Sequence, residues 1–105
     1  MIHIYDSEVD NLGELIKQKD IIILYFSAIW CGPCKRMHKP LEELSELHSN
    51  EVVIIKIDVD EYPEISDDLE IKSLPTFLFF KSGEINCKTQ GANLDEFKSN
   101  LYSLL

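Results

Sequence analysis

The stretch Trp30-Cys31-Gly32-Pro33-Cys34-Lys35 decides the fold, because it joins two segments of opposite character. Before it, Ile21-Ile22-Ile23-Leu24-Tyr25-Phe26 is a continuous β-prone run, which is typical of a strand buried on both faces of a sheet. After it, residues 32–49 have the periodicity of a long helix, which Pro40 is expected to interrupt with a kink. The side chains expected to face inward from this helix are Met37, Leu41, Leu44 and Leu47. A buried strand is therefore predicted to end where a helix begins.

Further strand-like segments are spread along the whole chain. We expect strands at 1–5, 52–57, 76–80 and 84–90. Ser82-Gly83 is predicted to be a tight turn, which makes the last two strands an antiparallel hairpin.

Helix-like segments lie between these strands. Ser7 is the expected N-cap of the first helix, with Asp10 at the capping-box position, and this helix is expected to end near Lys19. Its apolar stripe would be Val9, Leu12, Leu15 and Ile16. A short helix is expected from Pro63 to about Ile71, and a last one after the cap Asn93. The order predicts an α/β fold, with a central mixed five-stranded sheet flanked by four helices, in a single domain spanning 1–105.

Composition excludes several classes of function. The chain has 105 residues, 45% of them hydrophobic, and a formal net charge of -9. An acidic chain lacks the basic face that binds nucleic acid or anionic lipid, so neither partner is expected. The longest apolar run, Ile21–Ile29, is too short to cross a bilayer, and residues 1–5 carry no basic leader. A cytoplasmic location is the default expectation, although a processed organellar protein would look the same.

The chain has three cysteines, and two of them, Cys31 and Cys34, have the spacing of a redox pair or of metal ligands. Structural zinc needs four Cys or His ligands. The remaining candidates form no second paired cluster; they are Cys87, His3, His38 and His48. A redox role is therefore favoured, with no metal and no cofactor expected. Unpaired N–H groups and the positive end of a helix dipole would favour the thiolate of Cys31.

The motif at 30–35 resembles the active site of thioredoxins, and Ser73-Leu74-Pro75-Thr76 resembles the cis-proline loop of that family. Gly83 and Gly91 also fall where the family carries glycines. The resemblance covers nearly the whole chain and implies a thioredoxin fold. It also implies a protein-disulfide reductase that acts by thiol–disulfide exchange and contributes to cell redox homeostasis.

The resemblance implies a role for each residue of the site. Cys31 would be the exposed nucleophile and Cys34 the shielded resolving cysteine. The residues implied in substrate binding are Trp30, Gly32, Pro33, Leu74, Pro75 (in cis) and Gly91. The implied partners are disulfide-containing client proteins and a thioredoxin reductase-type electron donor, and the protein is expected to be a monomer.

The sequence departs from the family at three positions. Tyr25 stands where the family has a buried aspartate, and Ile54 is expected at the position of the lysine that faces it. We therefore hypothesise that deprotonation of Cys34 is less assisted here. Pro40 lies one residue later than the family proline. Two alternatives stay open: a binding module of a larger assembly with secondary redox activity, and a net oxidant.

Overall fold

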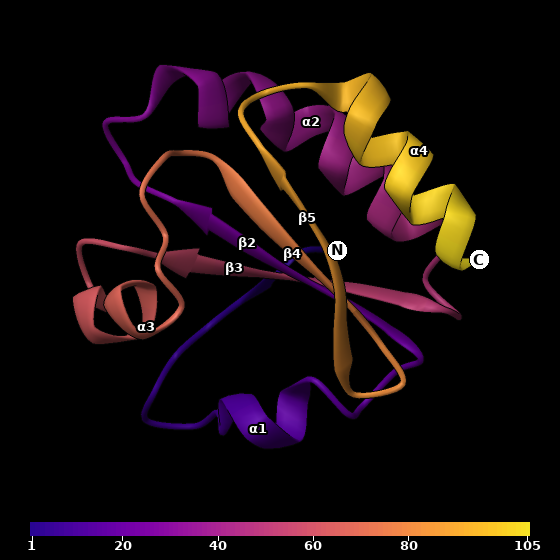
Figure 1. Ribbon diagram of the computed structural model, residues 1–105, viewed down its shortest axis with the longest axis horizontal. Helices are drawn as coiled ribbons and strands as arrows, with labels where there is room; N and C mark the ends of the chain where they lie inside the picture. The colour runs from indigo at the N-terminus through magenta and orange to yellow at the C-terminus, as the bar shows by residue number, and fades with distance from the viewer.

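The computed structural model describes residues 1–105, which form one mixed sheet with the strand order β1-β3-β2-β4-β5 (Figure 1). The strands are β1 (His3–Ile4), β2 (Ile21–Ser27), β3 (Val52–Asp58), β4 (Thr76–Lys81) and β5 (Glu84–Gln90). β1, β3 and β2 are parallel, whereas β4 runs antiparallel to both β2 and β5. The predicted mixed five-stranded sheet is confirmed.

The helices cover both faces of the sheet, as predicted. They are α1 (Leu12–Leu15), α2 (Gly32–Leu47), α3 (Pro63–Asp68) and α4 (Leu94–Leu104). Figure 1 shows α2 and α4 together on one face and α1 and α3 on the other. Every residue of β2 is buried, and alternate residues enter two separate hydrophobic clusters. Tyr25 belongs to the cluster under α2 and α4, and Phe26 to the cluster on the opposite face.

The prediction for the first helix is wrong at both ends, and α1 ends at Leu15 rather than near Lys19. α1 begins at Leu12, and its N-cap is Asn11, whose side chain accepts a hydrogen bond from the Glu14 N–H. The Asp10 carboxylate instead accepts from the Asp6 N–H, which closes a turn ahead of the helix. Val9 is 79% exposed and takes no part in the apolar stripe.

The long helix α2 is close to its prediction. It is α-helical through Pro40, so the later position of this proline causes no break. Met37, Leu41 and Leu44 are buried as expected, whereas Leu47 is 72% exposed at the C-terminal end. The buried residues of α2, from Cys34 to Leu44, therefore pack in one hydrophobic cluster with residues of the sheet.

Local signals near the C-terminus are confirmed. Ser82 and Gly83 both have positive φ (53° and 83°), the geometry of a tight hairpin turn. Asn93 caps α4 by accepting a hydrogen bond from the Glu96 N–H.

The α3 helix ends at Asp68 rather than near Ile71. None of the four helices has the length and apolar character needed to span a membrane.

Candidate active site

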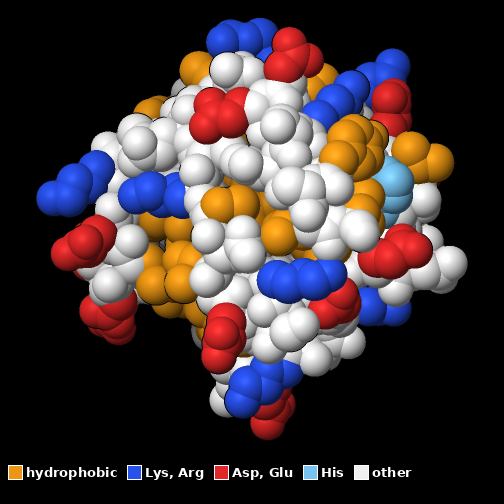
Figure 2. All heavy atoms as spheres, turned by 45° about the vertical axis from the view of Figure 1, so that its right-hand side comes forward, with side chains coloured by type: hydrophobic (Ala, Val, Ile, Leu, Met, Phe, Trp, Pro, Cys, Tyr) orange, Lys and Arg blue, Asp and Glu red, His pale blue; other side chains and the backbone are white.

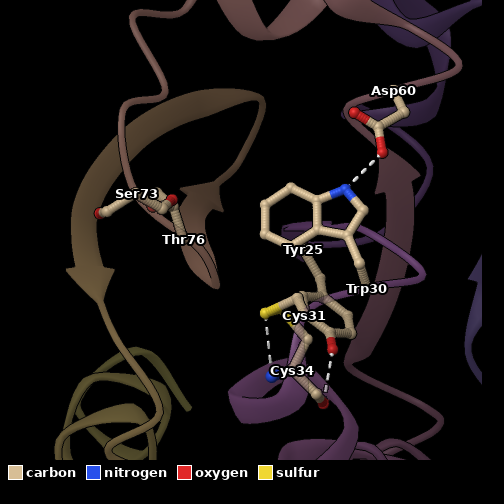
Figure 3. The surroundings of a disulfide bond; sticks show 7 residues. All are labelled: Tyr25, Trp30, Cys31, Cys34, Asp60, Ser73 and Thr76. Carbon is tan, nitrogen blue, oxygen red and sulfur yellow. Dashed lines mark hydrogen bonds between the residues drawn. A yellow bond between two sulfur atoms is a disulfide. The ribbon is translucent and has the colours of Figure 1, made fainter.

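The cysteine motif lies at the carboxyl end of β2, where α2 begins (Figure 3). Cys31 is the N-cap of α2, with extended backbone angles, and its Sγ accepts from the Cys34 N–H at 3.2 Å. Pro33 occupies the first turn, where the missing N–H of proline leaves no helical bond unmade. Cys31 and Cys34 form a disulfide, with Cα atoms 5.3 Å apart. When this bond is reduced, the helix N-terminus favours a thiolate at Cys31.

The two cysteines differ in the cavities they line rather than in exposure. Their exposed fractions are 4% for Cys31 and 3% for Cys34, so the expected contrast between an exposed and a shielded cysteine is not seen. The closed disulfide buries each sulfur against the other. Cys31 lines a cavity of about 630 Å³, which we call the Cys31 groove. Cys34 lines a different cavity of about 390 Å³, which we call the Cys34 cavity.

The Cys31 groove brings together four of the six residues implied in substrate binding. These are Trp30, Gly32, Pro33 and Leu74. The lining also includes Ser73, which belongs to the loop already singled out in the sequence. The other lining residues were not predicted; they are Val59, Pro63, Ser66, Asp67, Ile71 and Lys72. They come from the end of β3, from α3 and from the loop after it, so only the fold brings them to the motif.

Pro75 and Gly91 do not line the groove but support its wall. The Leu74–Pro75 bond is cis, and Pro75 is buried. The Gly91 N–H donates to the Pro75 carbonyl at 2.8 Å, and the Thr76 hydroxyl donates to the Ser73 carbonyl at 2.6 Å. The loop that carries Leu74 is thus tied on both sides, and it lies opposite Trp30 (Figure 3).

Asp60 is a site residue that the sequence reasoning missed. Its carboxylate accepts a 2.7 Å hydrogen bond from the Trp30 indole nitrogen, which holds a side chain that is 69% exposed. A signal was present, because parallel strands end at the same edge of a sheet. Asp60 follows β3 just as Trp30 follows β2. The Asp58 carboxylate accepts a hydrogen bond from the Asp60 N–H and so stabilises the turn that carries Asp60.

Tyr25 lies beneath the disulfide, and its hydroxyl points toward Cys34 (Figure 3). It is 1% exposed, stacks on Phe77 with ring centroids 4.9 Å apart, and donates to the Cys34 carbonyl at 3.0 Å. Burial raises the pKa of the Tyr25 phenol, and a hydrogen bond with Ser27 opposes the rise. Tyr25 is therefore a neutral hydrogen-bond donor at neutral pH.

The expectation that Ile54 takes the position facing residue 25 is wrong. In the parallel register Ile54 pairs with Ile23, and Lys56 pairs with Tyr25. The Lys56 Nζ lies 5.9 Å from the centroid of the Tyr25 ring. The strand position that pairs with Tyr25 therefore carries a lysine and not an isoleucine.

Other polar and thiol groups do not join the site. Cys87 is a free, half-buried cysteine on β5, and burial raises the pKa of its thiol. No group of three or more His, Cys, Asp or Glu side chains lies together in a way that could hold a metal ion.

The sequence matches known proteins over nearly all of its length. The family model described as Thioredoxin matches residues 3–103. Thioredoxin H9 of Arabidopsis thaliana is 40% identical over 96 residues, which cover 91% of this chain and 68% of the relative. Thioredoxin of Oryctolagus cuniculus is 40% identical over 101 residues, covering 96% and 90% of the two chains.

Solved structures agree. Mitochondrial thioredoxin 3 of Saccharomyces cerevisiae, in its oxidised form, superposes with a TM-score of 0.87 at 35% identity, covering 98% of this chain and 95% of that one. Plasmodium falciparum thioredoxin gives 0.86 at 35% identity, covering 99% and 100%. With a disulfide-forming pair at the head of α2 and this match of fold and sequence, the chain belongs to the thioredoxin family and is a dithiol–disulfide oxidoreductase.

Proposed function

We propose that the protein reduces disulfides of client proteins, with Cys31 as nucleophile and Cys34 as resolving cysteine. The observation that carries this assignment is the division between the two cavities. Cys31 caps α2 and lines the Cys31 groove, which is large enough for a segment of another chain. Cys34 lines only the smaller Cys34 cavity behind it. An incoming disulfide therefore meets Cys31 first.

The proposed reaction is two successive exchanges. The Cys31 thiolate attacks one sulfur of the client disulfide, the client S–S bond breaks, and one client thiolate leaves. Cys34, as thiolate, then attacks the Cys31 Sγ of this mixed disulfide. The second client thiolate leaves, and the Cys31–Cys34 disulfide forms. Two electrons have passed to the client, and a separate reductase-type donor returns them.

The groove supports binding of an extended client segment. Trp30 and Pro33 give it apolar contact area on the side of the cysteines, and Leu74 forms the facing wall. The Leu74 N–H and C=O make no backbone hydrogen bond within the chain. They are free to pair with a client backbone as a short β-strand addition. Gly32 leaves room beside Cys31, since no atom lies within 4 Å of the position a Cβ would take.

The two cysteine roles are tested by insulin reduction with dithiothreitol as donor. Cys31→Ser is expected to give no acceleration over dithiothreitol alone. Cys34→Ser is expected to retain the first exchange and to accumulate a mixed disulfide through Cys31, visible by intact mass. Cys87→Ser is the matched control and keeps full activity. Accumulation through Cys34 in the Cys31→Ser variant, but not through Cys31, would reverse the assignment.

A cytoplasmic location, a role in electron transport and a monomeric state complete the proposal. A pair used as a dithiol needs a compartment that keeps thiols reduced, and the half-buried Cys87 is also a free thiol. All groups of the site come from one chain, so no second copy is needed. Cell fractionation and light scattering test these points. A binding module with secondary redox activity is not favoured, and the reduction potential separates a reductant from a net oxidant.

A further inference from the structure

The Cys34 cavity is unusual in its charge. Its lining includes the basic side chains of Lys35, His38 and Lys56, and no carboxylate. The chain as a whole has 19 acidic and 10 basic residues. On the face shown in Figure 2, acidic and basic side chains are interspersed. A cavity beside a redox cysteine whose basic side chains are accompanied by no carboxylate is therefore a local exception in this acidic chain.

Lys56 is the least exposed of the three basic groups that line the Cys34 cavity. It comes from β3, is half-buried, and pairs in register with Tyr25. Its Nζ lies near the Tyr25 ring and forms no salt bridge with any carboxylate of the chain. Lys35 and His38 are exposed on α2, so water screens their charges more strongly.

No protein group beside Cys34 can act as an anionic base. From β2, the Tyr25 hydroxyl donates a hydrogen bond to the Cys34 carbonyl, and burial raises the pKa of this phenol. From β3, Asp58 lies on the same face of the strand as Lys56. Its carboxylate accepts hydrogen bonds from the Asp60 and Glu61 N–H groups and does not line the cavity. β4 contributes the uncharged Phe77.

We propose that the Lys56 ammonium stabilises the Cys34 thiolate, so that a fixed positive charge replaces the buried base in the resolving step. This inference rests on the assignment of Cys34 as resolving cysteine. The Cys34 thiol loses its proton to water in the cavity, and no protein carboxylate takes it up. The resulting thiolate attacks the Cys31 Sγ of the mixed disulfide, and the client thiolate leaves. A positive charge nearby favours the anionic form of a thiol.

The step can be isolated with dipyridyl disulfide in a Cys87→Ser background. The first thiopyridone is released when Cys31 attacks, and the second when Cys34 resolves. Stopped-flow absorbance across a pH series gives the ionisation that controls the second release. A parallel titration of Cys34 thiolate absorbance in Cys31→Ser/Cys87→Ser measures the ionisation of Cys34 without a mixed disulfide.

Lys56→Met is expected to slow the second release about threefold or more near neutral pH and to move its pH profile upward. The first release should be unchanged. Lys56→Arg keeps the charge and restores both profile and rate. Lys88→Met, on the exposed side of β5, is the matched control and leaves both releases unchanged. High salt narrows the difference between wild type and Lys56→Met.

Two results overturn the inference, and they are distinguishable. If wild type resolves the mixed disulfide but Lys56→Met keeps the same pH profile, Lys56 has no such role and the proposed reductase stands. If the wild-type mixed disulfide is never resolved by Cys34, the assignment of the two cysteines fails, and the inference fails with it. Circular dichroism of each variant separates these results from loss of the fold.

Discussion

The Trp30 indole nitrogen donates a 2.7 Å hydrogen bond to the Asp60 carboxylate, joining the segment after β2 to the segment after β3. Trp30 is 69% exposed and lines the Cys31 groove, so little packing fixes its ring. The hydrogen bond is thus the main restraint on one wall of the groove. A restraint of this kind matters for binding a client more than for the exchange of sulfurs.

Replacing Asp60 by alanine is expected to raise KM for a protein client about two- to fivefold and to leave kcat nearly unchanged. The reason is that the hydrogen bond which holds the Trp30 ring contributes about 1 kcal/mol and is lost. Trp30 is the only tryptophan, so its fluorescence anisotropy should fall in the same variant. Asp60→Asn keeps an acceptor oxygen and should remain close to wild type. An unchanged KM together with a lowered anisotropy would show that fixing the Trp30 ring does not contribute to client binding.

Signals carried by neighbouring residues were enough to predict much of this fold. The continuous run in β2, the Ser82-Gly83 turn and the Asn93 cap were all found correctly, because each depends on a few adjacent residues. The predicted N-cap of the first helix was wrong for a related reason. Ser7 and Asn11 are both acceptable caps, and the turn between Asp6 and Asp10 decides between them.

Features that depend on strand register could not be predicted from the sequence alone. β3 is apolar almost throughout, so its pattern does not show whether Ile54 or Lys56 pairs with Tyr25. The Asp60 contact and the separation of the two cavities likewise need β3 to lie beside β2. The motif was enough to predict the chemistry, whereas the residues that surround each cysteine could be identified only from the fold.

Cys87 is expected to react more slowly than Cys31 with iodoacetamide. Burial raises the pKa of the Cys87 thiol, which lowers its thiolate fraction, and its half-buried position limits access. In the reduced protein near neutral pH, peptide mass spectrometry should find Cys31 alkylated at least about tenfold faster. Unfolding in urea should bring Cys87 to the rate of an ordinary thiol. Equal rates in the folded protein would contradict this expectation.

The cap of α4 gives a stability prediction that is independent of the active site. The Asn93 side chain accepts the Glu96 N–H at 3.0 Å, and α4 packs Phe97 against Phe77 and Phe79. Asn93→Ala should lower the free energy of unfolding by about 1 kcal/mol. Asn93→Asp keeps the acceptor and should cost much less. Urea unfolding measures both variants, and insulin reduction should be unchanged in each.

Tyr25 should make the fold sensitive to alkaline pH. Burial raises the pKa of its phenol, so the folded protein holds this proton more tightly than the unfolded chain. The associated stability is complete below the ordinary tyrosine pKa of about 10 and is lost as pH rises from there through the folded value. Tyr25→Phe has no such proton, so its unfolding free energy should fall less steeply over this alkaline range.

The same variant also removes the hydrogen bond to the Cys34 carbonyl, so its effect on the free energy of unfolding should differ in size between neutral and alkaline pH. Near neutral pH, Tyr25→Phe should be less stable by about 1 kcal/mol, since a buried carbonyl loses a donor. At alkaline pH this deficit should shrink, because wild type then carries the cost of a buried phenolate. Tyr5, whose pKa burial also raises, contributes to the wild-type slope and requires Tyr5→Phe as a second comparison. Tyr102→Phe, at a 48% exposed position, is the matched control. A deficit for Tyr25→Phe that stays constant across the alkaline range would show that the Tyr25 proton is not held by the fold.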